Sequence, residues 1–89
     1  MKIKMKNKII QEGKITDIQK LYDSKNKEYC IVRIKYVNKN ESYYIDCYIL
    51  PNVYQNFKGY YKKGDYITVE GILQKKNSNH LTIKVKKII

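Results

Sequence analysis

The chain has 89 residues, enough for one small domain with a modest core and too few for a second. Its 19 Lys and Arg residues exceed its 8 Asp and Glu residues. The resulting formal charge of +11 points to a polyanionic partner, most often nucleic acid. No apolar run approaches the ~20 residues that a membrane span needs, and no secretory signal is visible. The two cysteines form no CxxC pair, and together with the lack of a signal they favour a reducing, cytoplasmic location.

The first strand is expected near the N-terminus, where residues 1–10 alternate between lysine and apolar side chains. Residues 1–6 are equally typical of a flexible basic arm. The strand becomes firm near Ile9 and continues through Gly13 to Ile15, with Gly13 marking a bulge or a bend. Residues 16–27 are polar and end in the turn-forming segment 23–27.

Two alternating runs, 29–37 and 42–50, form a predicted β-hairpin around the polar loop 38–41. Successive side chains of a strand point to opposite faces. The core face of the first run holds Cys30, Val32, Ile34 and Tyr36, and its exposed face holds Ile31, Arg33 and Lys35. One face of the second run holds Tyr44, Asp46 and Tyr48, and the other holds Tyr43, Ile45, Cys47 and Ile49. Closing the hairpin places Arg33 and Lys35 on the same face as Tyr44 and Tyr48.

The rest of the chain predicts one short helix and two more strands. The helix begins with Asn52 as its N-cap and buries Val53, Phe57 and either Tyr60 or Tyr61. The fourth strand spans 66–73, with Ile67, Val69 and Leu73 facing inward and Gly71 at a second bend. A polar hairpin loop, 75–79, leads into the fifth strand at 81–86.

Five strands with a helix between the third and fourth predict an all-β fold, a five-stranded OB-fold Greek-key barrel in one domain spanning 1–89. The number of strands alone is also compatible with an SH3-like barrel, but the position of the helix favours the OB-fold. OB-folds bind oligonucleotides with their central strands and flanking loops.

Several short blocks resemble the bacterial single-stranded-DNA-binding protein family. They are Asn7–Ile10 with Gly13–Ile15, Tyr22, Tyr44–Cys47, Lys63–Asp65 and Val69–Gly71, which follow the order and spacing of that family over about residues 7–87. The resemblance implies an OB-fold that binds single strands by base stacking and phosphate contacts and assembles as a dimer or a tetramer. It also places Tyr44 at a base-stacking position.

The chain departs from this family at several positions. Leu50, Asn40 and the loop near Asn77 lack stacking aromatics, and Gln11 and Glu12 are polar where the first strand of the family is apolar and joins subunits. The acidic C-terminal tail of the bacterial proteins is absent from this sequence.

The candidate nucleic-acid-binding residues are Tyr44, Tyr48, Arg33, Lys35, Tyr22, Lys75 and Lys76. Exposed tyrosines are also simply good strand formers, so stacking competes with this plainer interpretation. Asp46 is the one carboxylate on the tyrosine face and is interpreted as a salt-bridge partner of Arg33 or Lys35.

Metal and catalytic sites find no support in the sequence. Cys30 and Cys47 are expected to be buried thiols, and with His80 in a surface loop they do not supply the four ligands that zinc needs. No nucleophile motif or phosphate-binding glycine loop is present, so no cofactor and no enzymatic activity are expected.

Two functions follow from these observations. The first is binding of single-stranded DNA without sequence specificity, in DNA replication or the maintenance of a mobile element. The second is an OB-fold accessory subunit that binds a primase, polymerase or helicase, which the missing aromatics and missing tail favour. An RNA-binding OB protein is a third, less favoured class.

Overall fold

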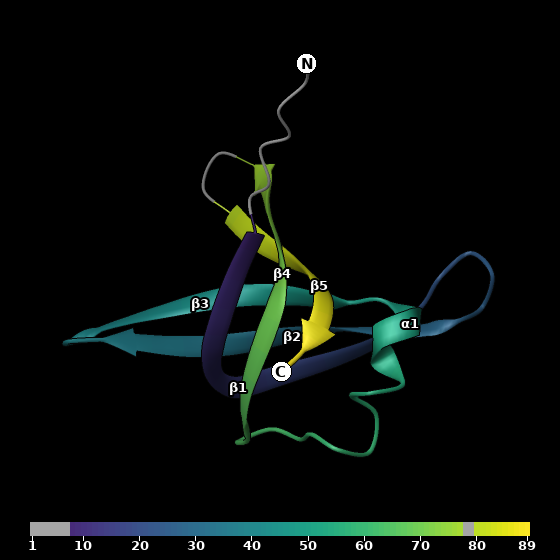
Figure 1. Ribbon diagram of the computed structural model, residues 1–89, viewed down its shortest axis with the longest axis horizontal. Coiled ribbons are helices and arrows are strands. Elements are labelled where there is room, and N and C mark those ends of the chain that lie inside the picture. The colour runs from purple at the N-terminus through teal and green to yellow at the C-terminus, as the bar shows by residue number, and fades with distance from the viewer. Residues whose placement is uncertain (1–7, 78–79) are drawn as a thin grey trace.

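The computed structural model describes residues 8–77 and 80–89, so the predicted basic arm at 1–6 lies outside the described residues. The described elements are five strands and one helix, shown in Figure 1: β1 (Lys8–Tyr22), β2 (Glu28–Asn38), β3 (Glu41–Ile49), α1 (Pro51–Tyr54), β4 (Tyr66–Asn77) and β5 (His80–Ile88). No helix in this part of the chain is long and apolar enough to cross a membrane.

The strands form a closed barrel in the order β1-β2-β3-β5-β4. The long β1 pairs antiparallel with β4 through its first half and with β2 through its second half. A short parallel pairing of β3 with β5, over residues 46–49 and 82–85, closes the barrel. This topology, with the helix between β3 and β4, confirms the predicted OB-fold over the SH3-like alternative.

Two glycines, at which bends are predicted, allow strands to approach one another closely. A Cβ atom on Gly13 would lie 2.9 Å from the carbonyl oxygen of Lys35, at the point where β1 curls from β2 towards β4 (Figure 1). A Cβ atom on Gly71 would overlap the carbonyl oxygen of Lys84, and the register of β4 with β5 shifts between Glu70 and Gly71. Both sites are bends that a larger residue would obstruct.

The core fills the barrel with the inward side chains of all five strands, mostly β-branched. The fully buried members are Ile15, Cys30, Val32, Ile34, Cys47, Ile49, Val69, Ile83 and Val85. The helix and the turns that follow it add Val53, Tyr54 and Phe57 at one end of the barrel, where the Phe57 and Tyr61 rings stack with centroids 5.5 Å apart. The apolar faces predicted for β4 and for the helical segment are therefore confirmed.

The helix is shorter than predicted and begins earlier. Its N-cap is Leu50 rather than Asn52. Pro51 can be the first helical residue, because the N–H that proline lacks would have no partner within the helix at that position. Successive turns replace the helix after Tyr54, and Gly59 adopts a positive φ of 83° that ends any helical continuation. Tyr60 is consequently 75% exposed and does not pack on the core.

The hairpin of β2 and β3 extends well beyond the barrel, which the alternating pattern did not predict. The other edge of β2 pairs with β1 only up to Lys35, and the other edge of β3 pairs with β5 only from Asp46. Residues 36–45 therefore form a two-stranded hairpin arm, visible at the left of Figure 1. Tyr36 and Tyr43, expected on core-facing sides, are 39% and 44% exposed because no third strand described in this structure covers them.

Candidate nucleic-acid interface

Tyr44 and Lys35 lie directly opposite each other on the outer face of β3 and β2. The Tyr44 side chain is 56% exposed, and Lys35 is half-buried beside it. Directly opposite residues in an antiparallel pair have Cβ atoms about 4.5–5.5 Å apart, so a cation and an aromatic ring share this surface. The register thus confirms that the hairpin places Arg33 and Lys35 on the face of Tyr44 and Tyr48.

Arg33 is held by Asp46 on the neighbouring strand, as predicted. The guanidinium donates from Nε to Oδ1 over 2.9 Å and from Nη2 to Oδ2 over 3.4 Å. This hydrogen bond raises the pKa of Arg33 above its usual value, and the charges of Asp46 and Asp17 add to the effect. Asp17 lies opposite Arg33 on β1, so two carboxylates and one guanidinium form a row across three strands. Lys63 lies 4.0 Å from Asp17, so two cations balance the two carboxylates and this row adds no net charge to the middle of a basic face.

Tyr48 lies on the far side of this row of paired charges from Tyr44. The two tyrosines are four residues apart on β3, which corresponds to about 13 Å along a strand. Tyr48 is half-buried, with Ile31 of β2 opposite it on one side and Lys84 of β5 on the other. The two rings therefore do not form one continuous platform.

Tyr22 is placed far from Tyr44. It is the last residue of β1, not part of a turn, and pairs with Glu28 at the opposite end of β2 from Lys35. Seven residues of β2 separate the two positions, about 23 Å along the strand. The Lys20 ammonium lies 5.8 Å from the centroid of the Tyr22 ring, which is 56% exposed. Tyr22 belongs to a separate part of the surface.

The backbones of Lys75 and Lys76 belong to β4 rather than to a loop. This strand ends at Asn77, four residues beyond the predicted end at 73. Their side chains lie outside what the structure describes, and so does that of His80, whose backbone begins β5 rather than a loop. Their predicted roles remain predictions.

One cationic neighbour of the Tyr44 face was missed in the sequence. Lys14 of β1 lies directly opposite Lys35, and its side chain is exposed. The alternating pattern of residues 9–15 marks Lys14 as outward-facing, but only the pairing of β1 with β2 shows which lysine it adjoins.

The two cysteines are buried and free. Burial raises the pKa of the Cys30 thiol to about 12 and that of the Cys47 thiol also to about 12, so neither is a nucleophile near neutral pH. Within residues 8–77 and 80–89, no group of three His, Cys, Asp or Glu side chains could hold a metal ion.

Solved structures with the same fold include the mitochondrial single-stranded DNA binding protein Rim1 from S. cerevisiae. One selenomethionine-labelled crystal of its second form matches with a TM-score of 0.74 and 19% identity, covering 97% of this chain and 94% of that chain. The first crystal form matches with a TM-score of 0.70 and 18% identity, covering 96% of this chain and 95% of that chain.

The similarity is confined to structure. No protein-family model matches the sequence, and no curated protein matches it. At this level of identity the likeness to Rim1 establishes the fold, and it covers almost the whole of both chains.

Proposed function

We propose that this protein binds single-stranded DNA without sequence specificity, on the outer face of β2 and β3. The observation that carries the proposal is the exposed Tyr44 ring directly beside Lys35, on a barrel with a net charge of +11. Stacking on an aromatic ring is tolerant of sequence because every base has a π-face, and lysines follow the phosphates. The fold shared with a protein named for binding single-stranded DNA supports the same function.

The candidate residues contribute unequally in this proposal. Tyr44 stacks on a base and Lys35 contacts the adjoining phosphate. Arg33 contributes less, because a phosphate would compete with Asp46 for the guanidinium. Tyr48 supplies a second, separate stacking position next to Lys84. Tyr22 would form a separate contact, and Lys75 and Lys76 are further candidate phosphate contacts, which single-site variants would test.

The Tyr44→Ala variant tests this function directly. We expect its affinity for a fluorescently labelled oligo-dT, measured by anisotropy, to fall by about 5- to 150-fold, since a stacked base contributes about 1–3 kcal/mol. Tyr44 is more than half exposed, so the barrel should fold without its ring. The matched control is Tyr60→Ala, which removes an exposed tyrosine from the connection between α1 and β4. Equal affinities for Tyr44→Ala and Tyr60→Ala would remove Tyr44 from the interface.

A second function is favoured by the hairpin arm. Tyr36 and Tyr43 lie opposite each other near its base, with ring centroids 6.3 Å apart, and Val37 beside them is 56% exposed. Exposed apolar side chains on a projecting ribbon suit contact with another protein. In this alternative the chain is an accessory subunit of a primase, polymerase or helicase. Tight binding to oligo-dT only after such an enzyme is added would favour it.

Assembly and location form part of the proposal. We infer a homodimer or a homotetramer from the resemblance described above, and a reducing compartment such as the cytoplasm from the two free thiols. The protein acts as a binding protein rather than an enzyme. Light scattering on the purified chain measures the number of subunits.

A further inference from the structure

Four side chains from four strands that pair in succession lie in register across the base of the hairpin arm and the outside of the barrel. Tyr44 of β3 is opposite Lys35 of β2, Lys35 is opposite Lys14 of β1, and Lys14 is opposite Tyr66 of β4. Three spacings between adjacent strands make this cross-strand row about 14 Å long. A tyrosine therefore stands at each end of a pair of lysines, and Tyr66 was not among the residues singled out in the sequence.

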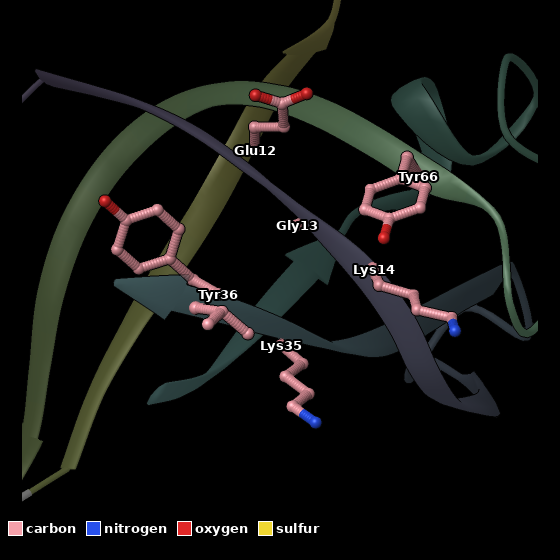
Figure 2. Close-up of a pocket in the computed structure, with 7 residues that line it drawn as sticks. Glu12, Gly13, Lys14, Lys35, Tyr36 and Tyr66 are labelled. Carbon is pink, nitrogen blue, oxygen red and sulfur yellow. The ribbon is translucent and has the colours of Figure 1, made fainter. Parts of the chain in front are cut away.

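The end of the row at Tyr66 opens into a cavity. Its volume is about 430 Å³, and it is lined by Glu12, Gly13, Lys14, Lys35, Tyr36, Val37 and Tyr66. Figure 2 shows the Tyr36 and Tyr66 rings on opposite sides of Gly13, while Glu12 points away from both lysines in this view. Gly13 itself faces the core, since a Cβ atom there would meet the Ile34 side chain, so only its backbone lines the cavity between the two rings. The Tyr66 side chain is 69% exposed, so its ring is accessible.

The charges indicate which way a polyanion crosses this surface. A strand of DNA that ran along β3 from Tyr44 to Tyr48 would pass the carboxylates of Asp46 and Asp17. Arg33 and Lys63 are already paired with these carboxylates. A strand that ran along the cross-strand row would instead meet Lys35 and Lys14 in succession. The two lysines outnumber Glu12, the one carboxylate that lines the cavity, so the second direction offers the phosphates net positive charge, whereas the first crosses a group of balanced charges.

We propose that single-stranded nucleic acid crosses the barrel along the row Tyr44, Lys35, Lys14 and Tyr66. One base stacks on Tyr44, the phosphates that follow contact Lys35 and Lys14, and a later base stacks on Tyr66 and enters the cavity beside Gly13. The path leaves the face of β2 and β3 and continues over β1 onto β4. This inference rests on the proposed function, because it assigns the route of the same ligand.

The occupant of the cavity is a nucleic acid rather than a second copy of this chain. Lys14 and Lys35 both line the cavity, and the whole chain carries a net charge of +11. Two copies meeting there would bring like charges together, whereas a polyanion would neutralise them. The cavity also adjoins Tyr44 through Lys35, so the two sites form one continuous surface.

Two substitutions test the row against matched controls. We expect Tyr66→Ala to weaken binding to labelled oligo-dT about 5- to 150-fold, with the salt dependence unchanged. We expect Lys14→Ala to reduce the slope of log K against log salt by about 0.7 in magnitude, the value for one phosphate contact on a single strand. Tyr60→Ala and Lys25→Ala, which remove exposed side chains off the row, should bind as the wild type does. Photocrosslinking of the wild-type protein to an oligonucleotide that contains 5-bromodeoxyuridine should label the peptide containing Tyr66.

The outcomes separate this inference from the proposed function. If Tyr44→Ala binds weakly while Tyr66→Ala and Lys14→Ala bind as the wild type does, the row is wrong and the proposed function stands. If the wild type does not bind oligo-dT, both the proposed row and the proposed function are wrong. A change in the light-scattering mass on Tyr66→Ala would place Tyr66 between copies of the chain and overturn the row. Crosslinks at Tyr44 but none at Tyr66 would also overturn it.

Discussion

Asp46 is the residue that most affects how the tyrosine face can bind a polyanion. Its carboxylate accepts two hydrogen bonds from Arg33, and Asp17 stands on the other side of the same guanidinium. The pair orients Arg33 and links β2 to β3, but it neutralises the guanidinium between Tyr44 and Tyr48, and Asp17 is paired with Lys63. At the scale of single residues, the charged side chains in the centre of this face therefore hold the strands together more than they bind phosphates.

The Asp46→Asn variant should bind oligo-dT more tightly than the wild type. Asparagine retains an oxygen that can accept from Arg33, while the charge that repels phosphates disappears. Two like charges about 4 Å apart in water repel by about 1 kcal/mol, which corresponds to about fivefold in affinity. Anisotropy titration measures this gain, and thermal unfolding measures the loss of an ion pair, which is typically below about 1 kcal/mol.

The matched control for Asp46→Asn is Glu70→Gln. It removes one negative charge from β4, where Glu70 pairs with Lys8 over 3.6 Å, away from the face of Tyr44. If Glu70→Gln gained as much affinity as Asp46→Asn, only the total charge of the protein would determine the affinity. Weaker binding by a folded Asp46→Asn protein would contradict the role given to this carboxylate.

At the scale of elements, period-two alternation predicted where the strands lie. It did not predict where the pairing of one strand with the next one ends. The inward positions of β2 from Cys30 to Ile34 are buried as predicted, yet Tyr36, next in the same pattern, is exposed. The reason is that β1 turns away at Lys14 to pair with β4. The alternation of apolar and polar residues is a property of one strand, whereas the burial of a side chain depends on the other strands that cover it.

The same limit applies to the candidate interface. The hairpin loop at 38–41 fixes the register of β2 with β3, so the sequence alone could place Lys35 beside Tyr44. The row reaches Lys14 and Tyr66 through pairings of β1 that join distant segments of the chain, and no local pattern specifies their register. The shorter helix has a local cause, since Pro51 and Gly59 act within the segment itself.

The crossing of β4 and β5 at Gly71 predicts a strong effect of a small substitution. In Gly71→Ala, the new methyl group would collide with the backbone of Lys84 and the Ile83 side chain, and a backbone cannot move aside cheaply. We expect a loss of about 1–3 kcal/mol or more in the free energy of unfolding, measured by urea denaturation.

Gly13→Ala is the comparison for this prediction. Its methyl group would lie 2.9 Å from the Lys35 carbonyl oxygen and 3.1 Å from the Ile34 Cβ, a tight but smaller conflict. The variant should lose less stability than Gly71→Ala. The reverse order, or no loss in either variant, would mean that the strands can separate at these bends.

At the scale of the whole molecule, the excess of positive charge disfavours the compact state and favours a bound polyanion. Six described ion pairs offset some of the charge, yet most of the lysines whose side chains the structure describes lie outside these pairs and are available to phosphates. If about six cations contact phosphates, log K should fall against log salt with a slope near −4 for a single strand. Charge alone, however, would attract duplex DNA as well. The rings are what favour a single strand, because only unpaired bases are free to stack on them.

The most direct test of the account is therefore a titration of the wild-type protein with single-stranded and duplex DNA of the same length, at two salt concentrations. We predict tighter binding to the single strand at both concentrations, with the preference persisting at higher salt because stacking is not screened. Equal or tighter binding to the duplex would contradict the account, since it would leave the exposed tyrosines without a role in DNA binding.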